Sequence, residues 1–101
     1  MIQHLVLFKL KEEAQGRSKK ENIAIAREIA SRFTKEISTC RSAHIVENMP
    51  GSPSNNEDIM LICTFDDLEG LYYYKDHPTH VAFGEFITSV REKRTSIDYE
   101  E

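Results

Sequence analysis

The chain has 101 residues, of which 40% are hydrophobic and 30% charged, as in a soluble globular protein with one modest core. Seventeen acidic and thirteen basic residues give a net charge of −4 without a long run of either sign, which argues against a nucleic-acid surface. There is no signal-peptide pattern and no apolar stretch of membrane-spanning length, so we expect a single cytoplasmic domain over residues 1–101, without membrane or nucleic-acid partners.

The first half of the chain predicts two strands separated by a long helix. Ile2–Leu10 is apolar at almost every position, as in a strand buried on both faces. A capping box at Ser18–Glu21 and the amphipathic stripe that follows predict a helix over about Ser18–Ser38. Ala43–Glu47 makes a shorter strand, and residues 48–56 hold turn formers that predict a loop.

The second half predicts a strand, a broken helix and a final strand. Ile59–Phe65 is apolar on both faces, and Asp66 with Glu69 predicts the start of a short helix. The buried side of this helix is predicted to hold three residues: Leu68, Leu71 and Tyr72. Pro78 suits the first position of a helix, which should run to about Val90. Thr95–Tyr99 is expected to form the last strand.

The order βαββαβ predicts a ferredoxin-like α+β fold, with helices on one face of a four-stranded antiparallel sheet. However, Ile2–Leu10 and Ile59–Phe65 carry apolar residues on both faces. The face without helices would hold four of them: Leu5, Leu7, Met60 and Ile62. An uncovered apolar face of this size marks an interface, so we expect a homodimer through the sheet faces, forming a dimeric α/β barrel.

The segment from Tyr74 to His80 places two imidazoles and a phenol within seven residues. His80 falls in the first turn of the helix that begins at Pro78, on the same face as Phe83. Both the helix dipole and burial disfavour the imidazolium form, so we expect the pKa of His80 to lie below about 6.5. A neutral imidazole facing apolar residues is either the base of a site or a well-satisfied core histidine.

The other histidines have simpler interpretations. His77 is most simply a cap or surface residue, and His44 should be exposed. The spacing of His77 and His80 can support a metal, but no cysteine or well-placed carboxylate completes a ligand set, so we expect no metal. Strand alternation places His4 on a face that the helices could cover. Its pairing with Asp98 would be either a structural hydrogen bond or part of a site.

Three parts of the sequence together resemble one known family. They are the opening His4-Leu-Val-Leu-Phe-Lys9, the Tyr74…His77-Pro78-x-His80-x-x-Phe83 element and the final Asp98-Tyr99. This combination is similar to the stress-responsive α/β-barrel domain family, called Dabb, over essentially the whole chain. The resemblance implies small, dimeric, ferredoxin-like proteins, most of them without an assigned reaction.

One plant member of that family is a polyketide cyclase whose tail region is similar to this one. The resemblance implies that His80 is the acid/base group, Tyr74 its phenolic partner, and His4 and Asp98 supporting polar groups. No cofactor is implied, because an imidazole and a phenol can remove an α-proton and polarise a carbonyl. The cyclase has a histidine where Ile59 stands here, which implies a more apolar pocket at that point, so the resemblance does not imply the same substrate.

Three functions stay open at this stage. The first is a cofactor-free lyase or cyclase-like enzyme with a small apolar or polyketide-like ligand. The second is a non-catalytic, stress-associated dimer that is structural or binds an apolar ligand. The third is a cofactor-independent monooxygenase-like protein, by fold analogy alone. An open pocket in which His80 and Tyr74 converge would favour an enzyme, whereas closed packing of both side chains would favour a structural role.

Overall fold

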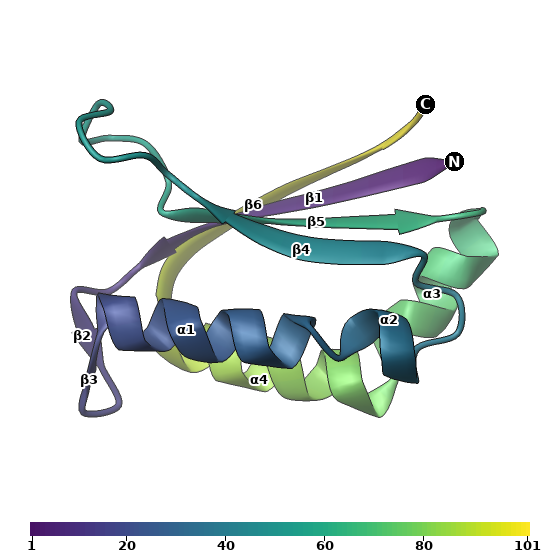
Figure 1. Ribbon diagram of the computed structural model, residues 1–101, viewed down its shortest axis with the longest axis horizontal. Helices are drawn as coiled ribbons and strands as arrows, with labels where there is room; N and C mark the ends of the chain where they lie inside the picture. Colours follow the sequence, from purple (N-terminus) through teal and green to yellow (C-terminus); the bar gives the residue numbers. More distant parts are fainter.

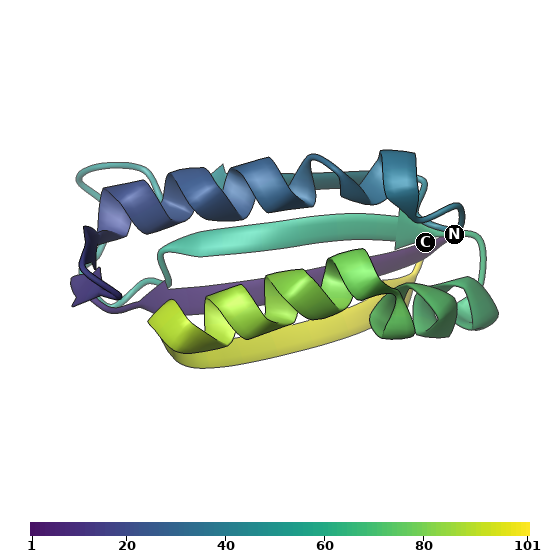
Figure 2. The ribbon, with the colours of Figure 1, turned by 90° about the horizontal axis from the view of Figure 1, so that it is seen from below.

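A computed structural model describes all residues from 1 to 101, and its four longer strands form one antiparallel sheet in the order β4-β5-β1-β6. The helices lie along one side of this sheet and leave the other side open (Figure 1). Seen from the helical side, α1 and α4 run side by side, with α3 beyond the start of α4 (Figure 2). In chain order the elements are β1 (Ile2–Leu10), β2 (Glu13–Ala14), β3 (Arg17–Ser18), α1 (Lys19–Ala30), α2 (Phe33–Glu36), β4 (Ser42–Glu47), β5 (Ile59–Phe65), α3 (Leu68–Asp76), α4 (Pro78–Val90) and β6 (Arg91–Glu100). The predicted ferredoxin-like class is confirmed.

The central strand β1 divides its side chains between the two faces of the sheet. Its odd-numbered positions Leu5 and Leu7 are only half-buried on the open face, whereas every second residue from Ile2 to Leu10 is buried under the helices. Strand β5 repeats this alternation, with Leu61 buried and Ile62 half-buried. The helix-covered face therefore carries the core, and the predicted pattern of two apolar faces is confirmed.

The predicted helix over Ser18–Ser38 is wrong in its second half. It begins as expected at the Ser18 capping box, but α1 ends at Ala30 and α2 begins at Phe33. The Ser31 hydroxyl donates to the Glu28 carbonyl oxygen at 2.6 Å, which competes with continued helical bonding. The restart at a new angle lets Phe33 become fully buried.

The short helix α3 begins one residue later than predicted. Asp67, not Asp66, is the N-cap, and its carboxylate accepts a hydrogen bond from the Gly70 backbone N–H at 2.8 Å. Leu71 is buried as predicted, and Tyr74, one turn further along, is the other large buried side chain of α3. Two predicted core residues are instead exposed: Leu68 and Tyr72.

Helix α4 matches the prediction from Pro78 to Val90, and His77 is its N-cap, with Nδ1 accepting from the Thr79 N–H at 3.1 Å. Strand β6 is longer than the predicted Thr95–Tyr99 because it starts directly after α4, at Arg91. None of the helices has the length and apolar character needed to cross a lipid bilayer.

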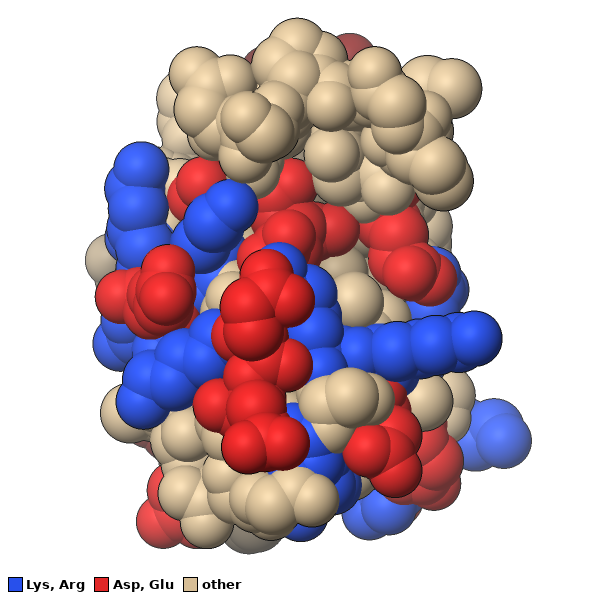
Figure 3. Space-filling model, turned by 90° about the vertical axis from the view of Figure 1, so that its left-hand side faces the viewer, with Lys and Arg blue, Asp and Glu red and all other residues tan.

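The small hairpin of β2 and β3 was not predicted, because each strand has only two residues and the turn is Gln15-Gly16. Both turn residues have positive φ, at 57° and 74°, as a tight two-residue hairpin turn requires. Figure 3 shows this end of the molecule, where basic and acidic side chains alternate. Lys19 there pairs with Glu12 at 3.0 Å and with Asp58 at 3.2 Å.

Candidate active site

A cavity of about 210 Å³ lies between α4 and the helix-covered face of the sheet. Three of the four predicted site residues line it: His4, Tyr74 and His80. An adjoining cavity of about 240 Å³ shares His4 and His80 and adds the fourth, Asp98. Strand β1, strand β6 and the α3–α4 junction thus bring residues that are far apart in the sequence to one place.

His80 stands in the first turn of α4, where the Pro78 break folds it back toward the end of α3. Its Nδ1 lies 3.0 Å from the Lys75 carbonyl oxygen. A carbonyl only accepts hydrogen bonds, so Nδ1 carries the proton and Nε2 of the neutral ring keeps the lone pair. Burial is the largest influence and lowers the pKa of His80, while the bond to Lys75 opposes this shift. The direction agrees with the prediction from the sequence.

His4 is held from the neighbouring strand. It lies opposite Asp98 in the register of β1 and β6, and its Nδ1 is hydrogen-bonded to the Asp98 carboxylate. Because the carboxylate accepts this bond, Nε2 of His4 is the free nitrogen when the ring is neutral. His4 is only 6% exposed, which confirms that its side of β1 faces the helices. The predicted hydrogen bond between the two strand ends is present.

Tyr74 is fully buried in the middle of this arrangement. Its ring centroid lies 4.4 Å from that of His80 and 6.0 Å from that of His4. The hydroxyl, however, lies 3.7 Å from Cys63 Sγ, so Tyr74 meets His80 through its ring. Burial raises the pKa of Tyr74 far above its ordinary value, which keeps the phenol protonated.

The two remaining histidines lie outside this cluster. His77 caps α4 through Nδ1, and His44 is exposed on β4. No group of three or more His, Cys, Asp or Glu side chains converges in a way that could hold a metal ion. The groups that meet at the two adjoining cavities are therefore two imidazoles and one carboxylate, with the Tyr74 ring as part of the wall, a set suited to moving protons.

Comparison with known proteins then defines the family. The sequence matches the family described as the stress responsive A/B barrel domain over residues 2–101. This chain belongs to the Dabb family. No curated protein matches its sequence.

Solved structures similar to this Dabb domain include several dimers. A dimeric protein with a ferredoxin-like fold from Bacteroides fragilis is 30% identical, with a TM-score of 0.80 over 99% of this chain and 95% of that chain. A Dabb protein from Mesorhizobium loti is 28% identical, with a TM-score of 0.75 and the same coverage of both chains. A hydroxynitrile lyase from Passiflora edulis is 13% identical, with a TM-score of 0.79 over 97% of this chain and 90% of that chain, and shares the fold.

Two residues of the Dabb domain that the sequence did not single out also line the site. Arg94 lines both cavities, and Arg91 lines the one beneath α4. Arg94, Ser96 and Asp98 are every second residue of β6 and lie on the same side of the sheet. The period of two along a strand would therefore have identified Arg94 as a residue of the site. It was missed because the last strand was predicted to begin at Thr95.

Proposed function

We propose that this Dabb domain is a cofactor-independent acid/base enzyme, a lyase for a small substrate that binds between α4 and the sheet. The observation that carries the proposal is the position of His80 at the cavity, together with the hydrogen bond that fixes its tautomer. Its Nδ1 is bonded to the Lys75 carbonyl, its pKa is lowered, and its ring borders a cavity that it shares with His4. Such a ring is neutral near about pH 7 and accepts a proton through Nε2.

The second imidazole gives the site a partner for this base. In a lyase reaction, His80 removes the proton of a substrate hydroxyl, the adjacent C–C bond breaks, and a carbonyl group forms. His4 in its imidazolium form, whose Nδ1–H is bonded to the Asp98 carboxylate, protonates the departing carbanion through Nε2 and becomes neutral. The proton that His80 removed is then passed to His4, which restores both rings to their starting states. The Passiflora protein supports this reaction class, because hydroxynitrile cleavage is a C–C lyase reaction on the same fold.

The size of the cavity favours a lyase over the cyclase-like alternative. About 210 Å³ lies below the range of roughly 300–1,000 Å³ typical of sites for drug-sized ligands. A long polyketide-like chain needs more room, whereas a compact hydroxy compound fits. Apolar walls formed by Val6, Phe83 and Ile87 suit the carbon skeleton of such a substrate.

A substrate panel tests the proposal. Small hydroxynitriles and hydroxyketones, both uncharged and carboxylate-bearing, are incubated with the protein, and carbonyl release is measured. We expect turnover that falls by about 10²-fold or more in His80→Ala, as for loss of a general base. His44→Ala removes an exposed imidazole on β4 and should keep full activity. If no member of the panel shows turnover that depends on His80, the proposed lyase is wrong.

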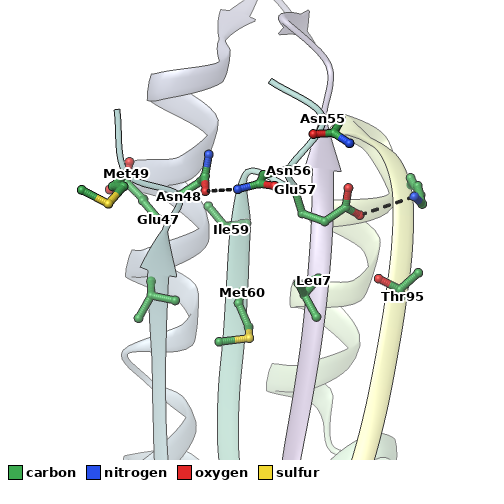
Figure 4. A pocket seen from close by; sticks show the side chains of 12 residues that line it. Leu7, Glu47, Asn48, Met49, Asn55, Asn56, Glu57, Ile59, Met60 and Thr95 are labelled. Carbon is green, nitrogen blue, oxygen red and sulfur yellow. Dashed lines mark hydrogen bonds and ion pairs between the residues drawn. The ribbon is translucent and has the colours of Figure 1, made fainter. Parts of the chain in front are cut away.

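We also propose that the open face of the sheet is the interface of a homodimer. Leu5, Leu7, Met60 and Ile62 are half-buried there, and Ile97 beside them is 60% exposed. This face is hollowed near the loop of residues 48–57, where a pocket of about 690 Å³ is bordered by Leu7 and Met60 (Figure 4). The dimeric state of the Bacteroides fragilis relative supports a second copy of the chain as the occupant.

A further inference from the structure

Two arginines reach the cavity beneath α4 from strand β6, and a bulge puts them on the same face. Arg91 and Arg94 are three residues apart, so strict alternation would send their side chains to opposite faces. The register with β1 shifts between Lys9 and Leu10, which pairs Leu10 with Arg91 and Phe8 with Arg94. Both partners are buried under the helices, so the bulge brings both arginines to the covered face.

The positive charge of these arginines is not balanced within the cavity. Neither guanidinium takes part in any of the ion pairs of the chain. Arg94 donates only to the Ser96 hydroxyl, at 3.3 Å, and Nε of Arg91 is buried without a hydrogen-bond partner. No Asp or Glu lines this cavity, and Asp98 in the adjoining one is bonded to His4.

A buried donor on a permanent cation costs free energy unless an acceptor meets it. The acceptor that fits is an anion inside the cavity, because every protein side chain around Arg91 leaves its Nε unpaired. A carboxylate is planar and has two acceptor oxygens, which match the forked geometry of a guanidinium. Two guanidiniums on one wall also make the cavity positive, although the whole chain has a net charge of −4.

We infer that the cavity binds a small molecule that carries a carboxylate, held by Arg91 and Arg94 while His80 acts on an atom at the other end of the molecule. This inference rests on the proposed function, because it names the substrate class of the same site. The arginines are on β6, and His80 is on α4 across the cavity. The carboxylate and the reacting atom are therefore at different ends of one short molecule.

Benzoate and benzamide are suitable probes, because they have nearly the same shape and differ in charge. In protein labelled with nitrogen-15, we expect benzoate to shift the Nε–Hε resonance of Arg91, a measurement that needs no variant. Benzoate should bind about tenfold or more tightly than benzamide, the effect expected of charge-assisted hydrogen bonds. Inorganic phosphate, a third probe, should bind more weakly than benzoate because it leaves the apolar walls unfilled.

Variants locate the interaction. Arg91→Gln and Arg94→Gln should each weaken benzoate binding by about tenfold or more and leave benzamide binding unchanged. Arg32→Gln removes the same charge from an exposed pair with Glu28, outside the lining of the cavity, and should change neither. The inference is overturned if benzoate does not bind, if it binds no better than benzamide, if phosphate binds more tightly, or if both cavity variants keep full affinity.

The two proposals can fail separately. Turnover that depends on His80, together with benzoate binding that depends on neither arginine, would leave the lyase standing and overturn the carboxylate assignment. Benzoate binding that depends on the arginines, without any turnover that depends on His80, would have the opposite meaning. In that case the domain would be a binding protein for small carboxylates.

Discussion

The two faces of the sheet come from the same alternating strands but differ in what covers them. On the helical side, Val6 and Leu61 are at most 3% exposed. The helices cover this face of the sheet (Figure 2). On the open side, their chain neighbours Leu5 and Ile62 are only half-buried. The polar groups and cavities of the two faces differ as well. The covered face contains the His4–Asp98 pair and the cavity beneath α4. The open face has a hollow beside the loop of residues 48–57.

A cover of helices does not make a sheet face purely structural. The covered face buries most of the core but leaves room for a site where α3 breaks into α4. The open face has the apolar composition of a core without a covering layer of its own chain. Apolar surface of this kind is stable in water when another surface removes it from solvent, which is the physical reason for the proposed dimer.

The largest effect is expected from a charge placed on the open face. Leu7→Asp should abolish dimer formation, because an unpaired carboxylate buried at an interface costs about 3–5 kcal/mol. Sedimentation of the variant at micromolar concentration should then give the 11.7 kDa monomer or unfolded material, while the wild-type protein sediments at twice that mass. A wild-type protein that sediments only as the monomer would contradict the proposed interface.

A control variant on the same face tests whether the interface centres on β1. His44 is exposed on β4, an edge strand of the sheet, and lies across from Ile62. His44→Asp introduces the same carboxylate at the edge of this face, two strands away from β1. It should disturb the dimer much less than Leu7→Asp, and equal effects would mean that the interface does not centre on β1.

Two neighbouring residues of β5 allow a direct comparison of the faces. Leu61→Ala creates a cavity in the covered core and should lower the free energy of unfolding by about 2–5 kcal/mol at every protein concentration. Ile62→Ala should act mainly through the dimer, so its effect should grow as the protein concentration rises above the dissociation constant. Chemical denaturation at several protein concentrations measures both, and an Ile62→Ala effect independent of concentration would argue against the interface.

Most of the fold could be predicted because periodicity and capping residues are local signals. The limits of β5 and α4 follow from an apolar run and from Pro78, and both agree with the structure. The failures lie where tertiary contacts override propensity. The break before Phe33 accompanies full burial of that ring. The N-cap of α3 is Asp67, whose carboxylate accepts from the Gly70 N–H, while Asp66 pairs with Arg41 at 2.7 Å instead.

The site was only partly visible in the sequence. His80 and His4 could be placed from the Pro78 helix start and from strand alternation, and the structure puts both at one cavity. The position of the Tyr74 hydroxyl could not be predicted from the sequence, because its place beside Cys63 depends on how α3 packs on β5. The side of the sheet on which Arg91 lies could not be predicted either, since a bulge that reverses the side of one residue leaves no trace in an alternating pattern.

The smallest expected effect concerns protonation of the covered face. The folded-state pKa of His80 is lowered, chiefly by burial, from the ordinary value of about 6.5 that it has in the unfolded chain. Between these two values the unfolded chain binds more protons, so the free energy of unfolding rises with pH there. The contribution of His80 is therefore fully present above about pH 6.5 and is lost as the pH falls through the folded-state pKa. Denaturation of the wild-type protein and of His80→Asn at a series of pH values isolates the contribution of His80 titration, because the smaller Asn side chain is polar but does not titrate. The difference in stability between the two should favour the wild-type protein more at higher pH.

A difference that instead shrinks as the pH rises through this window would mean that the pKa of His80 is raised in the folded protein. His80 would then be an acid rather than the base of the proposed lyase.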